Sequence, residues 1–202
     1  MPTVDDLRTF SDPPAPEGVS PYLVPQSRAP IAVVPYDPGW PDVYRRIADG
    51  IREVLGARVL RIDHIGSTSV PGLAAKPIID IDLTVADPDD EAGYVRPLVA
   101  AGWEHTVREP WWHGHRMLRR AEPRVNLHVF GTDSPETWRH LILRDHLRRD
   151  AGDRRRYAAI KQEAAALATA SAETVSQYNA RKEVVLREIV VTALRAAGVR
   201  EP

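Results

Sequence analysis

The sequence predicts an α+β protein with a mixed β-sheet, and two observations lead to this fold class. Strand-like runs and helical periods are interspersed over the first two thirds of the 202-residue chain, whereas the last third, from about residue 135, is helical. The composition, with 43% hydrophobic and 27% charged residues, is that of a globular protein able to bury a core. We therefore expect one α+β domain with flanking helices and a helical C-terminal part.

The elements follow from local signals. Residues 1–29 are rich in proline and have no helical or strand period, which predicts an extended or disordered arm ahead of a domain at 30–202. After a short apolar lead-in at 31–34, a helix is predicted from Pro41, with apolar residues at helical spacing, to Gly56. The later elements are predicted as strands at 59–65 and 77–85, a helix between 88 and 102, strands at 103–107, 112–118 and 124–130, and helices at 135–149, 153–169 and 172–197.

Composition excludes several functional classes. The chain has no cysteine, which excludes disulfide scaffolds, thiolate zinc sites and cysteine nucleophiles. No apolar run approaches the roughly 18 residues that span a bilayer, and the N-terminus lacks a signal-peptide pattern, so we expect a cytoplasmic protein with no membrane partner. The formal net charge of −1 argues against a protein that coats long nucleic acid.

Two acids inside an isoleucine-rich strand form the first candidate site. Side chains alternate between the two faces of a strand, so Asp80 and Asp82 share one face while the isoleucines face the core. Aspartate is a poor strand former, and two of them here oppose the local propensity. Because hard divalent ions prefer oxygen ligands, the pair predicts a Mg²⁺ site. The alternative is a half-exposed strand with two solvated acids.

A glycine-serine loop comes before this strand and is the second candidate site. Gly66 and Ser67 directly follow a predicted strand. Glycine permits close approach of a phosphate to the backbone, and Ser67, Thr68 and Ser69 supply hydroxyl groups. The Gly-Lys-Ser/Thr sequence of a Walker loop is missing, so the loop is not that kind of phosphate site.

This pattern resembles the signature of the nucleotidyltransferase superfamily with the polymerase-β-like fold: a strand, a Gly-Ser pair, about a dozen residues and then a strand with Asp-x-Asp. In that superfamily Gly-Ser holds the nucleotide phosphates and the two acids hold Mg²⁺. More closely, the run from His64 to Asp80 is similar to the GrpB family, a nucleotidyltransferase-like group, and the resemblance covers about residues 31–195. It implies a nucleotidyltransferase-like mixed sheet with a helical tail at about 135–198. The other segments that carry this similarity are 34–40, 126–129, 139–141 and 144–148.

The chain departs from the superfamily pattern at the third carboxylate, which belongs on a later strand. The strand predicted at 124–130 has Asn126 and His128 on its polar face instead of an acid. We therefore take His128, with Asp80 and Asp82, as a catalytic candidate that acts as a base or ligates a softer ion such as Zn²⁺ or Mn²⁺. His113 and His115 are expected to share a strand face and, if their strand pairs with that of Asn126 and His128, to converge with them near Asp80 and Asp82.

Positive side chains complete the predicted site. Lys76, Arg144 and Lys182 are the candidates for phosphate contact, and the chain has one further lysine, Lys161. His140 lies one helical turn from Arg144 on the same face of its predicted helix.

The leading functional hypothesis is a nucleotidyltransferase-like enzyme. It would use Mg²⁺ to transfer a nucleotidyl group from a nucleoside triphosphate to a small-molecule acceptor, with release of pyrophosphate. Two alternatives stay open. One is a non-catalytic nucleotide or small-anion binding protein that kept the fold. The other is a metal-dependent enzyme built from Asp80, Asp82 and His128, for which Zn²⁺ or Mn²⁺ would be preferred to Mg²⁺.

Overall fold

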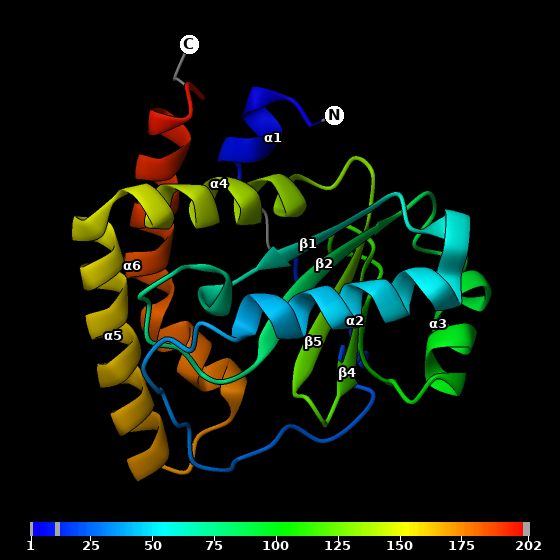
Figure 1. Cartoon of the computed structure of the whole chain (residues 1–202), viewed down its shortest axis with the longest axis horizontal. Coiled ribbons are helices and arrows are strands. Elements are labelled where there is room, and N and C mark those ends of the chain that lie inside the picture. Colours follow the sequence, from blue (N-terminus) through cyan, green and yellow to red (C-terminus); the bar gives the residue numbers. More distant parts are fainter. Residues whose placement is uncertain (1, 11–12, 200–202) are drawn as a thin grey trace.

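A five-stranded mixed β-sheet forms the centre of the computed structural model, which describes residues 2–10 and 13–199 (Figure 1). Its spatial order is β1-β2-β5-β4-β3. Strands β2 and β5 are parallel, and every other neighbouring pair is antiparallel. This arrangement confirms the predicted α+β class with a mixed sheet. The strands are β1 (Arg61–Ile65), β2 (Ile79–Val85), β3 (Glu104–Glu109), β4 (His115–Arg120) and β5 (Val125–Gly131).

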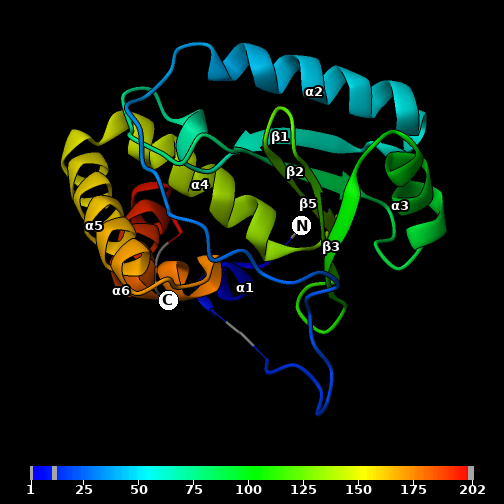
Figure 2. The same ribbon diagram turned by 90° about the horizontal axis from the view of Figure 1, so that it is seen from below.

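Helices cover both faces of the sheet. Figure 2 shows α2 on one side of the strands and α4 on the other, with α5 and α6 side by side at one end. None of the helices in the described part of the chain has the length and apolarity needed to cross a membrane. The α-helices are α1 (Val4–Arg8), α2 (Trp40–Leu55), α3 (Glu91–Ala100), α4 (Pro135–Arg149), α5 (Ala151–Ala170) and α6 (Val175–Ala196), and short 3₁₀ turns lie at 56–58 and 67–69.

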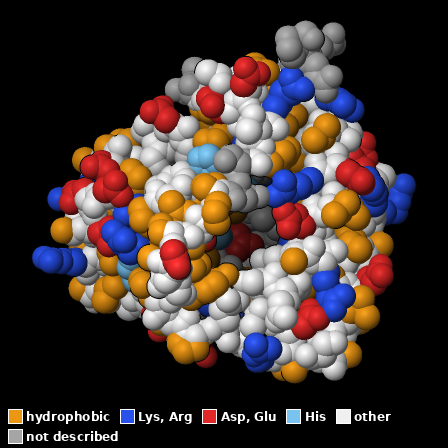
Figure 3. Space-filling model, turned by 180° about the vertical axis from the view of Figure 1, so that it is seen from behind, with side chains coloured by type: hydrophobic (Ala, Val, Ile, Leu, Met, Phe, Trp, Pro, Cys, Tyr) orange, Lys and Arg blue, Asp and Glu red, His pale blue; other side chains and the backbone are white. Residues whose placement is uncertain are grey.

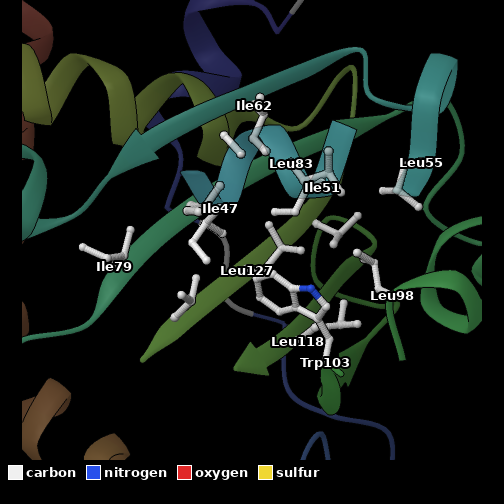
Figure 4. Packing of buried hydrophobic residues seen from close by; sticks show 14 of the residues in the cluster. Ile47, Ile51, Leu55, Ile62, Ile79, Leu83, Leu98, Trp103, Leu118 and Leu127 are labelled. Carbon is white, nitrogen blue, oxygen red and sulfur yellow. The ribbon is translucent and has the colours of Figure 1, made fainter. Parts of the chain in front are cut away.

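The main hydrophobic core lies between α2 and the sheet (Figure 4). Ile51 and Leu55 of α2 pack in one cluster with Leu83 of β2 and Leu127 of β5, and all four are buried. Burying an aliphatic side chain of this size contributes about 1.5–3 kcal/mol. Because this face of the sheet provides the stability, the opposite face can accommodate the polar side chains of β2 and β5.

Two apolar segments differ from a regular strand in the structure. The run at 31–34, for which the sequence allows a first strand or a lead-in, forms only an isolated bridge, between Val34 and Ala75. The strand predicted at 112–118 begins at His115, because residues 110–114 form a turn in which His113 has a φ of 52° and Gly114 a φ of 62°. His113 therefore lies in this turn, and the prediction that it shares a strand face with His115 is wrong.

The N-terminal arm contains a helix that its proline content did not indicate. Helix α1 is one short turn, capped by Thr3, whose side chain accepts from the backbone of Asp6 while the Asp6 carboxylate accepts from the backbone of Thr3. Its Leu7 is buried against α6. Further along the arm, Tyr22 makes a bridge to Val107 at the exposed edge of β3. The described parts of the arm therefore lie against the domain.

Candidate functional site

A cavity of about 410 Å³ lies between the polar face of the sheet and helices α4, α5 and α6. Figure 3 shows the face of the molecule opposite α2, where a hollow near the centre contains acidic atoms. All three lysines of the chain line the cavity, although they are widely separated in the sequence. The predicted site residues that line it are Gly66, Ser67, Thr68, Lys76, Asp80, His128, Arg144 and Lys182.

The two acids of β2 lie on the same face of the sheet but in different surroundings. Asp80 lines the cavity, and its Oδ1 accepts a hydrogen bond of 2.8 Å from Nδ2 of Asn126. Burial raises the pKa of Asp80, and the Asn126 hydrogen bond and the charge of Lys76 oppose this. Asp82 is only 1% exposed and does not line the cavity, and its Oδ2 is 2.8 Å from Nδ1 of His140.

His140 of α4 is a cation paired with this buried acid. Burial lowers its pKa, but the carboxylates of Asp82, Glu136 and Asp80 together outweigh burial and raise the pKa to about 9. The ring is therefore protonated at neutral pH and donates to Asp82. His140 lines the cavity together with Arg144, as expected from their predicted position on one face of this helix.

The acids of β2 could hold one divalent cation. Oδ1 of Asp82 is buried and has no hydrogen-bond partner among the described residues, which leaves an oxygen free for a cation. The register places Asn126 opposite Asp80 and His128 opposite Asp82, so β5 supplies no third carboxylate. His140 already neutralises part of the charge of Asp82, and the remaining oxygens of Asp80 and Asp82 fit a single Mg²⁺.

A second group of potential ligands lies away from the cavity. Ligand atoms of His146, Asp150 and Asp153 all lie within 4.8 Å of one another where α4 meets α5. Asp150 caps α5 by accepting from the backbone of Asp153, and Nε2 of His146 lies 2.7 Å from Oδ2 of Asp153. Helix capping accounts for this cluster.

The glycine-serine loop lies directly beside Asp80. Gly66 has φ of 67° and ψ of −170°, a conformation essentially restricted to glycine. A Cβ atom at this position would lie 2.6 Å from Oδ2 of Asp80. The hydroxyl of Thr68 donates to the carbonyl of Ile78, and that of Ser69 donates to the carbonyl of Gly66. These two hydroxyls therefore brace the loop, and Ser69 does not line the cavity.

Gly66→Ala is expected to lower the free energy of unfolding by more than the about 1–3 kcal/mol of backbone strain alone, because its Cβ would also displace Asp80. Gly72→Ala is the matched control: its φ is 77°, in the same loop, but no atom lies within 4 Å of the added Cβ. Urea unfolding of both variants measures the difference. Equal losses would show that close approach to Asp80 does not require a glycine.

Two lysines sit over tyrosine rings in the cavity wall. Nζ of Lys76 lies 4.7 Å from the ring centroid of Tyr178, and Nζ of Lys182 lies 5.2 Å from the same ring. Burial lowers the pKa of Lys76 to about 8, with Asp80 opposing and Lys182 adding to the effect. The structure thus brings both predicted lysines to the cavity.

Lys161 is the site residue that sequence reasoning did not select. It is 3% exposed, and its Nζ donates to Oγ of Ser67 at 2.9 Å and to the carbonyl of Ala74. Burial, with the charges of Lys182 and Lys76, lowers its pKa to about 7. The available signal was the scarcity of lysine, which drew attention to each one but did not indicate where Lys161 points.

Arg144 lines the cavity but is held by the protein. Its Nη1 donates to the backbone carbonyl of His64 at 3.1 Å, and its Nε donates to Oδ1 of Asp145 at 2.8 Å. The Nη1 group of Arg144 therefore already binds the backbone near the end of β1. Of the predicted phosphate contacts, Lys76 and Lys182 have more freedom to reach a ligand than Arg144 has.

His128 lines the cavity and belongs to a row of hydrogen-bonded side chains. Its Nδ1 lies 3.0 Å from Nε2 of His115, whose Nδ1 lies 2.7 Å from Oε2 of Glu109. Burial lowers the pKa of His128 well below its usual value, and the charge of His140 adds to this. The predicted convergence of His115 with His128 is therefore observed, through the pairing of β4 with β5.

Comparison with known proteins places this chain in a family. The family model described as GrpB protein matches residues 30–191. The chain belongs to the GrpB family. UPF0157 protein BH1888 of Halalkalibacterium halodurans is 43% identical over 165 residues, which cover 82% of this chain and 83% of that protein. The crystal structure of GrpB from Enterococcus faecalis matches with a TM-score of 0.72 and 29% identity, covering 83% of this chain and 99% of that one.

These matches confirm the predicted family and the nucleotidyltransferase-like fold. The GrpB region also resembles part of a larger protein, the dephospho-CoA kinase of Mycolicibacterium paratuberculosis, which is 33% identical over 165 residues. That match covers 68% of this chain and 40% of the kinase. The N-terminal arm before residue 30 lies outside the GrpB family match.

Proposed function

We propose that this GrpB protein is a nucleotidyltransferase-like enzyme that transfers a nucleotidyl group from a nucleoside triphosphate to a small-molecule acceptor. The observation that carries the proposal is the convergence, on one cavity, of the Gly66-Ser67 loop, the three lysines and the Asp80 carboxylate. A volume of about 410 Å³ falls within the range of small-molecule sites, roughly 300–1,000 Å³, which supports a small acceptor.

The lysines and the loop form the triphosphate site in this proposal. Lys161 donates to Ser67, so the amine and the hydroxyl lie at one point of the wall. Lys76 and Lys182 add positive charge nearby, and charge-assisted hydrogen bonds of this type recognise phosphate. In a partly enclosed cavity these contacts are stronger than in water. The site thus favours a polyanion.

The acids of β2 take the metal in this proposal. Asp80 and Asp82 would hold one Mg²⁺, which offsets the negative charge that the triphosphate carries during transfer. Asn126 keeps Asp80 oriented through its 2.8 Å hydrogen bond, and His140 does the same for Asp82. His128 is the candidate proton acceptor for the attacking group of the acceptor molecule.

The second candidate function is non-catalytic nucleotide or small-anion binding. The observation that favours it is the amide of Asn126 on β5, where the superfamily has an acid, with a hydrogen bond to Asp80. A protein of this kind would bind nucleotide and release no pyrophosphate. A third candidate, a Zn²⁺- or Mn²⁺-dependent enzyme, is favoured by the imidazole of His128 in the cavity wall.

Thermal unfolding with each of the four nucleoside triphosphates, with and without Mg²⁺, tests the proposal. A nucleotide at about 100 times its Kd adds about 2.7 kcal/mol, which corresponds to about 5–10 °C in Tm for a chain of this size. We expect the Mg²⁺-dependent part of the shift to disappear in the Asp80→Asn/Asp82→Asn variant. Pyrophosphate release in the presence of hydroxyl acceptors then separates transfer from binding.

The matched control for the double variant is Asp49→Asn, which removes an exposed carboxylate on α2, on the opposite side of the sheet. It should keep the full shift with nucleotide and Mg²⁺. Absence of a shift with every nucleotide, in a folded wild-type protein, would refute the nucleotide site. A shift that Zn²⁺ or Mn²⁺ supports and Mg²⁺ does not would favour the third candidate.

A further inference from the structure

A row of three side chains crosses from the β3–β4 hairpin to the cavity, with His115 buried and Glu109 and His128 partly buried. Oε2 of Glu109 lies 2.7 Å from Nδ1 of His115, and Nε2 of His115 lies 3.0 Å from Nδ1 of His128. Glu109 ends β3, His115 begins β4, and His128 lies in the middle of β5. Neither the hydrophobic core nor the phosphate-binding lysines require these polar groups, so their alignment calls for another explanation.

The order of donors and acceptors along the row follows from its carboxylate end. A carboxylate only accepts hydrogen bonds, so Nδ1 of His115 carries the proton that Glu109 accepts. In a neutral His115, Nε2 is then the acceptor, and Nδ1 of His128 must be the donor. A neutral His128 with its proton on Nδ1 has a lone pair on Nε2, the ring nitrogen left available to the cavity that His128 lines.

Ring packing holds this geometry in place. His115 is 5% exposed and stacks between His128, with ring centroids 5.2 Å apart, and Phe130, with centroids 4.9 Å apart. The edge of Trp112 also contacts His115, at 5.2 Å between centroids. Packing and a hydrogen bond at each ring nitrogen together restrict His115 to one orientation, as precise catalytic geometry requires.

We propose that Glu109 and His115 are positioning residues, which hold His128 as the tautomer whose Nε2 lone pair accepts a proton from the acceptor molecule. This rests on the proposed nucleotidyl transfer. The acceptor O–H bond breaks, its proton goes to Nε2 of His128, and its oxygen forms a bond to the α-phosphorus. The bond from that phosphorus to the bridging oxygen breaks, and its electron pair leaves with pyrophosphate.

The charged groups around His128 favour the neutral ring that this role needs. Arg119 on β4 and His140 on α4 both oppose a positive charge on it. Asp82 is its register partner on β2, but the carboxylate there is bonded to His140. The ring is therefore neutral before the reaction, and the lone pair on its Nε2 is not occupied by a proton.

Imidazole ¹⁵N NMR of the full chain tests the tautomer directly, and it needs no knowledge of the acceptor. We expect wild-type His128 to show a protonated Nδ1 and an unprotonated Nε2 between pH 6 and 8. In His115→Phe the partner of Nδ1 is lost, so Nε2 should become the protonated nitrogen. Glu109→Gln should give an intermediate population, because Gln can donate as well as accept and no longer fixes His115.

The controls are His105→Gln and Glu104→Gln, which change a histidine and an acid of β3 that do not line the cavity. Both should leave the His128 signals unchanged. A protonated Nε2 in the wild type, or no response in either His115→Phe or Glu109→Gln, would overturn the proposal. Should one of these variants fail to fold, the other decides the result.

A rate measurement tests the chemical role. Pyrophosphate release is measured with the nucleoside triphosphate that stabilises the protein and with glycerol or water as the probe acceptor. In both His115→Phe and Glu109→Gln it should be at least tenfold slower than in the wild type, with an unchanged nucleotide Kd. An unchanged rate would overturn the assignment. Failure of the wild-type protein to bind any nucleotide would refute the proposed function instead. The NMR measurement would still show whether Glu109 and His115 fix the tautomer of His128.

Discussion

Lys161→Met is expected to make the protein more stable at pH 6 while it weakens nucleotide binding about tenfold to a hundredfold. The stability gain arises because the amine is almost fully buried, and burial, with Lys182 and Lys76, lowers its pKa from 10.5 to about 7. Methionine fills a similar volume with no charge. The binding loss arises because a hydrogen bond to a charged group is worth about 1.5–3 kcal/mol.

The stability gain should depend on pH in a defined window. Between pH 7 and 10.5 the unfolded chain binds a proton at Lys161 that the folded chain lacks, so the free energy of unfolding of the wild type rises with pH there. Below pH 7 both states are protonated and the destabilisation is complete. The Tm advantage of Lys161→Met is therefore expected to be about 5 °C at pH 6, after allowance for its lost hydrogen bonds, and to shrink towards pH 10.

Calorimetry at pH 6, 8 and 10, with nucleotide titrations on the same samples, measures both effects. Arg155→Met is a suitable control, since Arg155 is an exposed cation on the same helix. It should change neither Tm nor nucleotide Kd appreciably. A Lys161→Met protein that is less stable than the wild type at pH 6 would mean that the hydrogen bonds to Ser67 and Ala74 outweigh the cost of burying the charge.

Local chemistry made the acids and the loop predictable from the sequence. The Asp-x-Asp pair follows from alternation along β2, and Gly66-Ser67 follows from its place after β1. Helices α4, α5 and α6 were close to their predicted ranges, because each has cap or periodicity signals that depend only on nearby residues. Features encoded within a few residues of one another can be read without knowing the fold.

Features that depend on packing between distant segments could not be predicted. Lys161 reaches Ser67, far away in the sequence, only because α5 packs against the loop. Glu109 meets His115 because β3 and β4 pair as antiparallel strands with these two residues opposite each other, and the turn that joins the strands removes His113 from the predicted face. Neither the packing of α5 nor the conformation of the turn has a local periodicity that would reveal it.

The helix in the N-terminal arm illustrates a third case, in which the signal was present but short. Thr3 and Asp6 have the spacing of a capping box, which is a helix start signal. A helix of 5 residues is not stable alone in water, so its formation depends on what it packs against. That partner is on α4 and α6, more than a hundred residues away in the sequence.

Arg139→Ala is expected to lower the free energy of unfolding by about 3–5 kcal/mol and to release this arm. Arg139 of α4 is 3% exposed, and its guanidinium donates to the backbone carbonyls of Leu7 at 3.0 Å and Thr9 at 2.6 Å. The guanidinium also forms an ion pair with Glu136, and its Cζ lies 4.9 Å from the ring centroid of Phe10. Removing it leaves Glu136 and the carbonyls of the arm without their buried donor.

Chemical denaturation and limited proteolysis measure the two consequences separately. Cleavage within the arm should become faster in Arg139→Ala, whereas Arg45→Ala, which removes an exposed arginine from α2, should alter neither property. Deletion of residues 1–9 supplies the decisive comparison. If Arg139 acts mainly by holding the arm, the deletion and Arg139→Ala will be strongly non-additive, because both remove the same contacts. Additive losses would instead show that Arg139 stabilises α4 through Glu136 alone.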